Sequence, residues 1–327
     1  MTSTAEVSEA QWEATARAFT EAVGSRRLDL PLPGHGQTRL RWAALAGLAE
    51  EDLSLARLGE GHADAIAILD ELSGPAARPG SRWGVWAARP PGPGLSAGRH
   101  GGGWRLDGTK QYCSGARVCT HALVTADTAD GVRLFAARTD GEGVRPVPGT
   151  WPAVGMAGSD TLNVRFDGVP AEPVGPPGGY TDRPGFSHGG CGVAACWYGG
   201  ARAVARPLLA AAGERDIGPH GFAHLGAVDI GLRVAAAALD AAADGIDDDP
   251  LDHKDAGARR ALRVRTLVEA VASDVLERVG RALGAGPLCH DAGQARATAD
   301  LAVYLRQHHA EKDLEALGRL VAAGGSI

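Results

Sequence analysis

The order of hydrophobic patterns along the 327-residue chain limits its fold more than any single motif does. Residues 8–24 and 38–72 carry apolar residues three and four apart, as amphipathic helices do. From Trp83 to about residue 175 the pattern changes to short runs separated by Gly and Pro, which is typical of antiparallel strands. Helical patterns return from residue 186. This order predicts an α+β protein rather than alternating βαβ units, and no G-x-G-x-x-G turn supports a Rossmann site.

The pattern changes predict three domains. We expect an N-terminal helical domain at 1–80, a central antiparallel β-domain at 81–184 and a C-terminal four-helix bundle at 185–327. Breaks rich in Gly, Pro and Asp separate the long helical patterns of the last block. The bundle helices are expected near 187–212, 221–244, 253–283 and 294–322.

A stretch from Gly101 to Ala116 stands at the centre of the predicted β-domain. Apolar and polar residues alternate around Trp104 and Leu106, and Asp107-Gly108 is a strong hairpin turn signal because Gly tolerates positive φ. We therefore predict a hairpin whose return strand begins at Lys110. That strand ends in small residues, so a large flat molecule could approach its backbone closely.

Composition narrows the class of partner and the compartment. The formal net charge is −6, which gives no electrostatic reason to expect nucleic acid or an anionic membrane. The five cysteines are an odd number without a C-x-x-C pair, as reduced thiols in a cytosolic protein would be. We find no run of about 18 apolar residues and no basic-then-apolar leader. A cytoplasmic protein that binds no membrane is the expectation.

The run from Gly108 to Gly115 resembles the G-x-K-x-[WF]-[IC]-[TS]-[NG] signature of acyl-CoA dehydrogenases, an FAD-dependent family. A second segment, residues 155–170, resembles the family's G-M-R-G-[ST]…V-P pattern, with Ala157 in place of Arg. The resemblance implies the acyl-CoA dehydrogenase-like α+β fold and an FAD cofactor. It further implies that Tyr112, Cys113 and Ser114 lie against the flavin.

Other landmarks match the family less closely. Arg215 falls near the helix start that supplies an Arg to the FAD phosphates, and a helix N-terminus with an Arg suits a diphosphate. A solvated Arg is the alternative. Gly284 and Ala285 lie in a segment similar to a Gly-rich loop that contacts the partner subunit's FAD, or they simply end a helix. Ala88 occupies the place of a flavin-binding Thr and cannot replace its hydroxyl.

The last helical segment departs from the family at the catalytic position. Many members hold a catalytic Glu where this chain has His308, so we predict a divergent member whose base is His308. A neutral imidazole could remove the α-proton of a thioester. The neighbouring residues are polar, so a solvated helix face is the alternative, and His308-His309 lacks the i, i+4 spacing of a metal site.

Three functions follow from the resemblance. The first is α,β-dehydrogenation of an acyl-CoA or carrier-tethered acyl thioester, by α-proton abstraction and hydride transfer to the flavin. The second is a flavin-dependent monooxygenase on the same fold, which the His308 replacement favours. The third is a non-catalytic partner subunit, which Ala88 and the missing carboxylate favour. The oligomeric states usual in the family imply a homodimer or homotetramer, or a hetero-oligomer with a paralogue.

Overall fold

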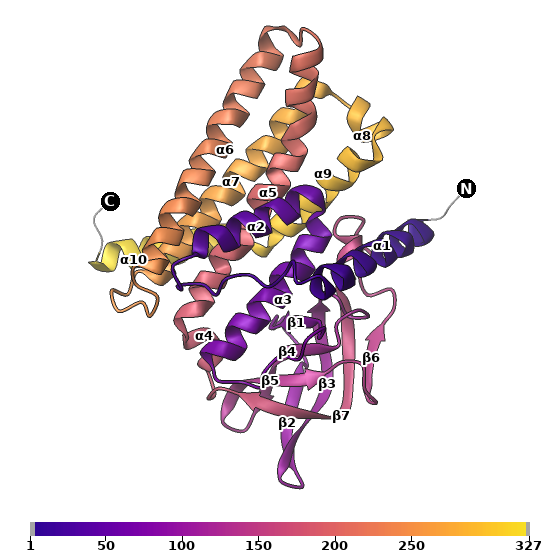
Figure 1. Cartoon of the computed structure of the whole chain (residues 1–327), viewed down its shortest axis with the longest axis vertical. Helices are drawn as coiled ribbons and strands as arrows, with labels where there is room; N and C mark the ends of the chain where they lie inside the picture. Colours follow the sequence, from indigo (N-terminus) through magenta and orange to yellow (C-terminus); the bar gives the residue numbers. More distant parts are fainter. Residues whose placement is uncertain (1–3, 325–327) are drawn as a thin grey trace. The chain divides into compact units, whose positions relative to one another are not determined.

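The computed structural model describes residues 4–324, and these residues form two compact units (Figure 1). The sheet unit contains the chain up to residue 30 together with 57–186. The helical unit contains 31–56 and the chain from residue 187 onward. The N-terminal helices, predicted as one domain at 1–80, therefore contribute to both units.

A seven-stranded sheet with the order β1-β4-β2-β3-β7-β5 forms the sheet unit. Strand β5 also pairs with β4, so β4, β2, β3, β7 and β5 close into a ring, and β6 adds to β7. The prediction of an antiparallel domain is correct for most pairings but wrong for β1 and β2, which run parallel to β4. The strands are β1 Trp83–Trp86, β2 Leu95–His100, β3 Gly103–Cys113, β4 His121–Thr128, β5 Gly131–Arg138, β6 Val144–Val147 and β7 Leu162–Val174.

The predicted turn at Asp107-Gly108 is wrong. Strand β3 runs straight through these residues, and the hairpin turn lies at Gly101-Gly102, where φ is 55° and 86°. Gly108 instead sits at a register shift opposite β7, with a φ of 118°. A Cβ on Gly108 would lie 2.5 Å from the Gly94 carbonyl oxygen, so Gly is needed there for a close approach of β2 and β3.

The core of the sheet unit lies between helix α3 (Leu53–Glu71) and the sheet. Ile68 and Leu69 of α3 are buried together with Leu123 of β4 and Leu134 of β5. Helix α1 (Thr4–Gly24) contacts the short turn η1 (Ala157–Ser159), and the short helix α4 (Gly179–Asp182) follows β7. This packing holds the loops before and after β7, and the loop before β7, which contains η1, forms part of the candidate site.

Close helix packing holds the helical unit together. A Cβ on Gly199 of α5 would lie 2.1 Å from the Ala46 carbonyl oxygen of α2, so the two backbones touch. Helix α7 buries an i, i+3/i+4 stripe that includes Val264, Val268 and Val275, as an amphipathic helix does. The helices are α2 Thr38–Glu51, α5 Pro184–Glu214, α6 Gly218–Asp247, α7 Gly257–Leu283, α8 Gly286–His290, α9 Ala292–Tyr304 and α10 Glu311–Gly324.

The last helix, predicted as one element over 294–322, is broken in the structure. Helix α9 ends at Tyr304, a 3₁₀ turn spans Leu305–Gln307, and α10 begins at Glu311. His308 between them is extended, with φ −78° and ψ 133°, and Ala310 has a positive φ of 49°. His308 therefore lies in a sharp turn and not on a helix face.

Helix α6 is long and apolar on average, although Asp229 and Arg233 interrupt its apolar residues. By length and composition it could cross a membrane, and only 17% of its most apolar 18-residue window is buried. Alanine is the commonest residue of this helix. Phe222, Ile230 and Val234 of this helix are exposed.

Candidate functional site

The end of strand β3 carries a strained and exposed aromatic residue. Lys110 pairs with Val164 of β7 and Cys113 pairs with Leu162, so Gln111 and Tyr112 together face a single residue of β7. This bulge gives Tyr112 a left-handed backbone with φ 58° and leaves its side chain 51% exposed. Backbone strain of this kind in an aromatic residue costs about 1–3 kcal/mol and concentrates at functional sites.

The residues after Tyr112 are buried and fixed by hydrogen bonds. The Ser114 hydroxyl lies 3.0 Å from that of Thr161, which in turn lies 2.8 Å from that of Ser159. Trp86 donates from Nε1 to the Ser114 carbonyl oxygen at 2.9 Å. The Gly115 amide donates to the Ser159 carbonyl oxygen. The strand end is thus a rigid backbone platform with Tyr112 projecting from it.

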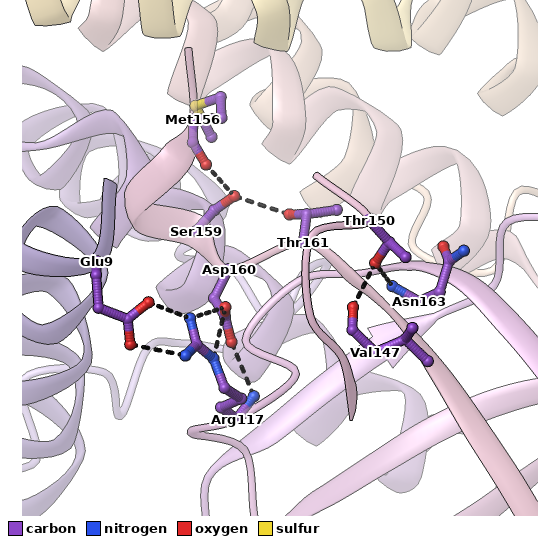
Figure 2. A network of polar contacts seen from close by, with 9 residues as sticks. All are labelled: Glu9, Arg117, Val147, Thr150, Met156, Ser159, Asp160, Thr161 and Asn163. Atoms are coloured by element: carbon purple, nitrogen blue, oxygen red, sulfur yellow. Dashed lines mark hydrogen bonds and ion pairs between the residues drawn. The ribbon is translucent and has the colours of Figure 1, made fainter. Parts of the chain in front are cut away.

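An ionic network holds the loop on which this platform rests (Figure 2). Arg117 donates from Nε and Nη2 to Asp160 at 3.0 and 2.8 Å, and from Nη1 to Glu9 of α1 at 2.8 Å. The Arg117 amide also donates to Asp160. Because Asp160 is almost fully buried, the network ties α1, the platform and the turn before β7 into one piece.

The platform suits binding better than proton chemistry. Burial raises the pKa of the Cys113 thiol far above its usual value, so the thiol stays protonated and unreactive. Asp160 is held between Arg117 side-chain and backbone donors. An exposed aromatic ring beside a bare strand end can receive a flat ring system, and this fits the flavin that the sequence predicts.

His308 is buried in the helical unit. Its Nε2 is 2.9 Å from the Thr266 hydroxyl of α7 and 3.6 Å from Asp313, and its Nδ1 accepts a hydrogen bond from the Ala310 amide. Burial lowers its pKa, against the raising effect of Asp313, and so favours the neutral ring. Since Nδ1 accepts, the neutral ring carries its proton on Nε2 and donates it to Thr266.

The predicted cofactor residues of the helical unit are exposed. Arg215 lies in the turn between α5 and α6, and Gly284 caps the end of α7 with φ 67°, followed by Ala285. Because α6 and α7 form an antiparallel pair, these residues share one end of it (Figure 1). His308 packs on Thr266, 17 residues before the end of α7, which places it roughly 25 Å away along the helix.

Sequence reasoning missed Asp160 and Thr161. The segment at 155–170 was noted only for its resemblance to the family pattern, whereas its Thr161 hydroxyl lies 3.0 Å from that of Ser114 and its Asp160 accepts from Arg117. An Asp directly after a Gly-Ser turn, followed by a strand, was the available signal. The polar role of that Asp could not be read without knowing that β3 and β7 are neighbours.

Comparison with known proteins identifies the fold but no close relative. No protein-family model matches the chain, and no curated protein matches it. Solved structures do. Dibenzothiophene monooxygenase TdsC from Paenibacillus sp. A11-2 is 20% identical over 98% of both chains, with a TM-score of 0.74.

Two further structures agree with this result. A variant titled Tcur3481-Tcur3483 steroid ACAD is 23% identical over 94% of this chain and 89% of that one, with a TM-score of 0.70. A chain from a structure titled electron transferring flavoprotein of Acidaminococcus fermentans reaches a TM-score of 0.83 at 14% identity, over 97% of this chain and 93% of that one. At these identities the likeness shows the fold alone, and that fold is the predicted mixed helical and β fold of acyl-CoA dehydrogenase-type proteins.

Proposed function

We propose that this chain is an FAD-dependent oxidoreductase that removes two hydrogens from an acyl thioester, carried by CoA or by a carrier protein. The observation that carries the proposal is Tyr112, strained and exposed on a rigid strand end in the signature segment. The fold likeness supports a flavin, since one TdsC structure is a complex with FMN and indole. The steroid ACAD likeness supports the dehydrogenase class.

The chain's own residues would divide the work. Tyr112, Cys113 and Ser114 would form the surface under the flavin rings, and Arg215, Gly284 and Ala285 would contact its diphosphate or that of a second subunit. The bound flavin supplies the acceptor for the substrate's β-hydride. His308 is the proposed base, and its lowered pKa keeps it neutral at pH 7, as a base must be. To accept a proton it has to release the Ala310 amide from Nδ1.

Anaerobic flavin reduction tests this proposal. The chain would be purified, reconstituted with FAD or FMN, and titrated with a panel of acyl-CoAs while the visible spectrum is recorded. Bleaching by one thioester is the predicted result, and His308→Ala should slow it at least tenfold. A flavin that stays oxidised with every thioester, but consumes oxygen when reduced externally, would assign the monooxygenase instead.

The buried and hydrogen-bonded position of His308 favours a second candidate function, that of a non-catalytic partner subunit. Both imidazole nitrogens are engaged, and helix α5 carries no carboxylate before Glu214. Such a subunit would keep the fold and complete the site of a catalytic paralogue. Failure to bind any flavin in the reconstitution would contradict the enzyme and support this role.

We also propose that the chain assembles with a second copy through helix α6. Its exposed face carries Phe222, Ile230 and Val234, an unusual apolar surface for a monomer. Asp229 and Arg233 lie four residues apart on the same helix, so an antiparallel two-fold pairing centred between them would match opposite charges across the axis. Ile230→Glu should give a monomer in light scattering, whereas Leu251→Glu, equally exposed but outside α6, should not.

A further inference from the structure

A cavity of about 300 Å³ lies inside the sheet unit, beside the candidate site. The Pro-rich loop that begins at Ala88 forms one wall, and strands β3 and β4 form the other. Its size leaves room for roughly ten water-sized groups, which suits a small organic ligand. The lining residues are 88–95, 109–111, Thr125 and Asp127.

Lys110 places a positive charge at the cavity wall. Its side chain is 4% exposed, and Nζ donates to the carbonyl and hydroxyl oxygens of Thr125, both at 2.7 Å. An ammonium has three donors, and these two are the hydrogen bonds it makes among residues 4–324. Burial lowers its pKa to about 8, which leaves most of the ammonium charged at pH 7.

The other charges of the cavity cancel. Arg89 donates to Asp127 at 2.7 Å, so this pair is neutral as a unit. Lys110 is then the uncompensated charge, and a buried uncompensated ammonium is costly. Three of the loop residues are prolines, at 90, 91 and 93, and prolines have no N–H, so the loop wall offers few backbone donors. Polar recognition falls to Lys110 and its neighbours Thr109 and Gln111.

We propose that this cavity binds the carboxylate of a small organic acid, with Lys110 as its counterion. One uncompensated positive charge matches a monoanionic carboxylate better than a phosphate, which carries nearly two charges at pH 7. The third ammonium hydrogen would donate to one carboxylate oxygen. The site does not require a bound flavin, so it stands or fails separately from the proposed reaction.

Butyrate is the direct probe, titrated against the full chain at constant ionic strength with chloride as the balancing anion. Saturable binding by calorimetry, with a matching rise in melting temperature, is the predicted result. Butyrate that does not saturate up to about 50 mM, or that inorganic phosphate displaces at equal concentration, would overturn the assignment.

Two surface variants test the charge logic without touching the buried Lys110. Asp127→Asn releases Arg89 and should tighten butyrate binding about tenfold, whereas Arg89→Gln leaves Asp127 to neutralise Lys110 and should weaken it about tenfold. Arg145→Gln removes an equal charge outside the cavity and should change nothing. Equal affinity in the Arg89 and Asp127 variants would contradict the proposal, because both residues are exposed and neither should unfold the chain.

The source of the carboxylate is resolved by competition. If it is the end of an acyl substrate, glutaryl-CoA should displace butyrate and butyryl-CoA should not. If it is a free acid, neither thioester should displace it. Both results support the site and differ only in what fills it.

Discussion

The strand end at Tyr112, here called the first corner, and the turn at His308, here called the second corner, were both candidate sites in the sequence. At the end of β3, Tyr112 has a strained backbone and an exposed ring. At the break between α9 and α10, His308 is buried with both ring nitrogens engaged. The first corner holds strain and leaves a surface open, whereas the second satisfies its polar atoms internally.

We interpret the Tyr112 region as a binding surface and the His308 region as a set of contacts that stabilises the fold. Strain in a native structure persists only where the surroundings enforce it, and the Arg117 and Asp160 network does so at the first corner. A buried, fully bonded imidazole contributes to stability whether or not it also takes part in chemistry. Removal of the exposed Tyr112 ring should therefore act mainly on ligand binding, whereas removal of the buried His308 ring should also lower the stability of the fold.

The largest loss of stability is expected at Gly115, which has a φ of 71° and follows Tyr112 by three residues. A Cβ there would lie 2.8 Å from the Cys119 sulfur and 3.1 Å from Leu58. Gly115→Ala should lower the free energy of unfolding by about 3 kcal/mol or more and abolish flavin binding. Gly80→Ala is the matched control in the same unit, since φ is 77° with open space around it. Its cost should be about 1 kcal/mol in denaturant unfolding, and equal losses would show that the platform is not tightly packed.

Acid should weaken the sheet unit through His62 of α3. Burial lowers the pKa of His62 to about 4, while its Nδ1 accepts from the Trp83 amide. The unfolded state, with pKa near 6.5, binds the proton first, so stability is full above pH 6.5 and falls as pH drops toward 4. The loss should reach about 3 kcal/mol. His62→Asn, which keeps an acceptor, should flatten the pH profile of unfolding, and an unchanged slope would assign it to other groups.

His308→Ala should lower the free energy of unfolding by about 1–3 kcal/mol, since it leaves Thr266 and the Ala310 amide without their partner. His309→Ala is the control, because that ring is exposed, and it should change stability by less than about 0.5 kcal/mol. The lowered pKa of His308 acts in the same direction as that of His62, so His308→Gln should also reduce the loss of stability below pH 6.5. Equal stability of the two alanine variants would contradict a stabilising role for His308 and would favour a catalytic one.

The sequence predicted the order of elements well because hydrophobic periodicity records which face each element buries. The strands expected at 83–88, 121–127, 131–137 and 143–148 correspond to β1, β4, β5 and β6, whereas no strand was expected at β2. Each of the long strands β3 and β7 was expected as two shorter runs, at 102–108 and 110–116 and at 161–167 and 172–175. Asp107-Gly108 misled because a Gly with positive φ serves a bulge as well as a turn. The direction of β1 and β2 depends on long-range pairing, which no local pattern encodes.

The candidate sites were predictable only in part. The signature segment placed Tyr112, Cys113 and Ser114 together, as the structure has them, and their contact with a flavin stays a prediction. The predicted helix across His308 concealed the turn at Ala310, whose positive φ a non-Gly residue rarely adopts. The roles of Arg215, Gly284 and Ala285 also stay predictions, because they depend on a cofactor and a second subunit.

The smallest effect on stability is expected at Tyr112 itself. Glycine adopts φ 58° freely, so relief of strain should offset the loss of the exposed ring. Tyr112→Gly should leave the free energy of unfolding within about 0.5 kcal/mol of the parent. A loss of 2 kcal/mol or more would mean that the ring is part of the core and not a binding surface.

Flavin titration of that variant is the most direct test of the strand-end site. FAD would be added to the parent chain, to Tyr112→Gly and to Ser73→Gly. Ser73 has a similar positive φ of 52° and lies between α3 and β1, outside the strand-end segment. Quenching of flavin fluorescence should report saturable binding to the parent and to Ser73→Gly, with at least tenfold weaker binding to Tyr112→Gly. Equal affinity of all three chains would show that the end of β3 does not contact the flavin.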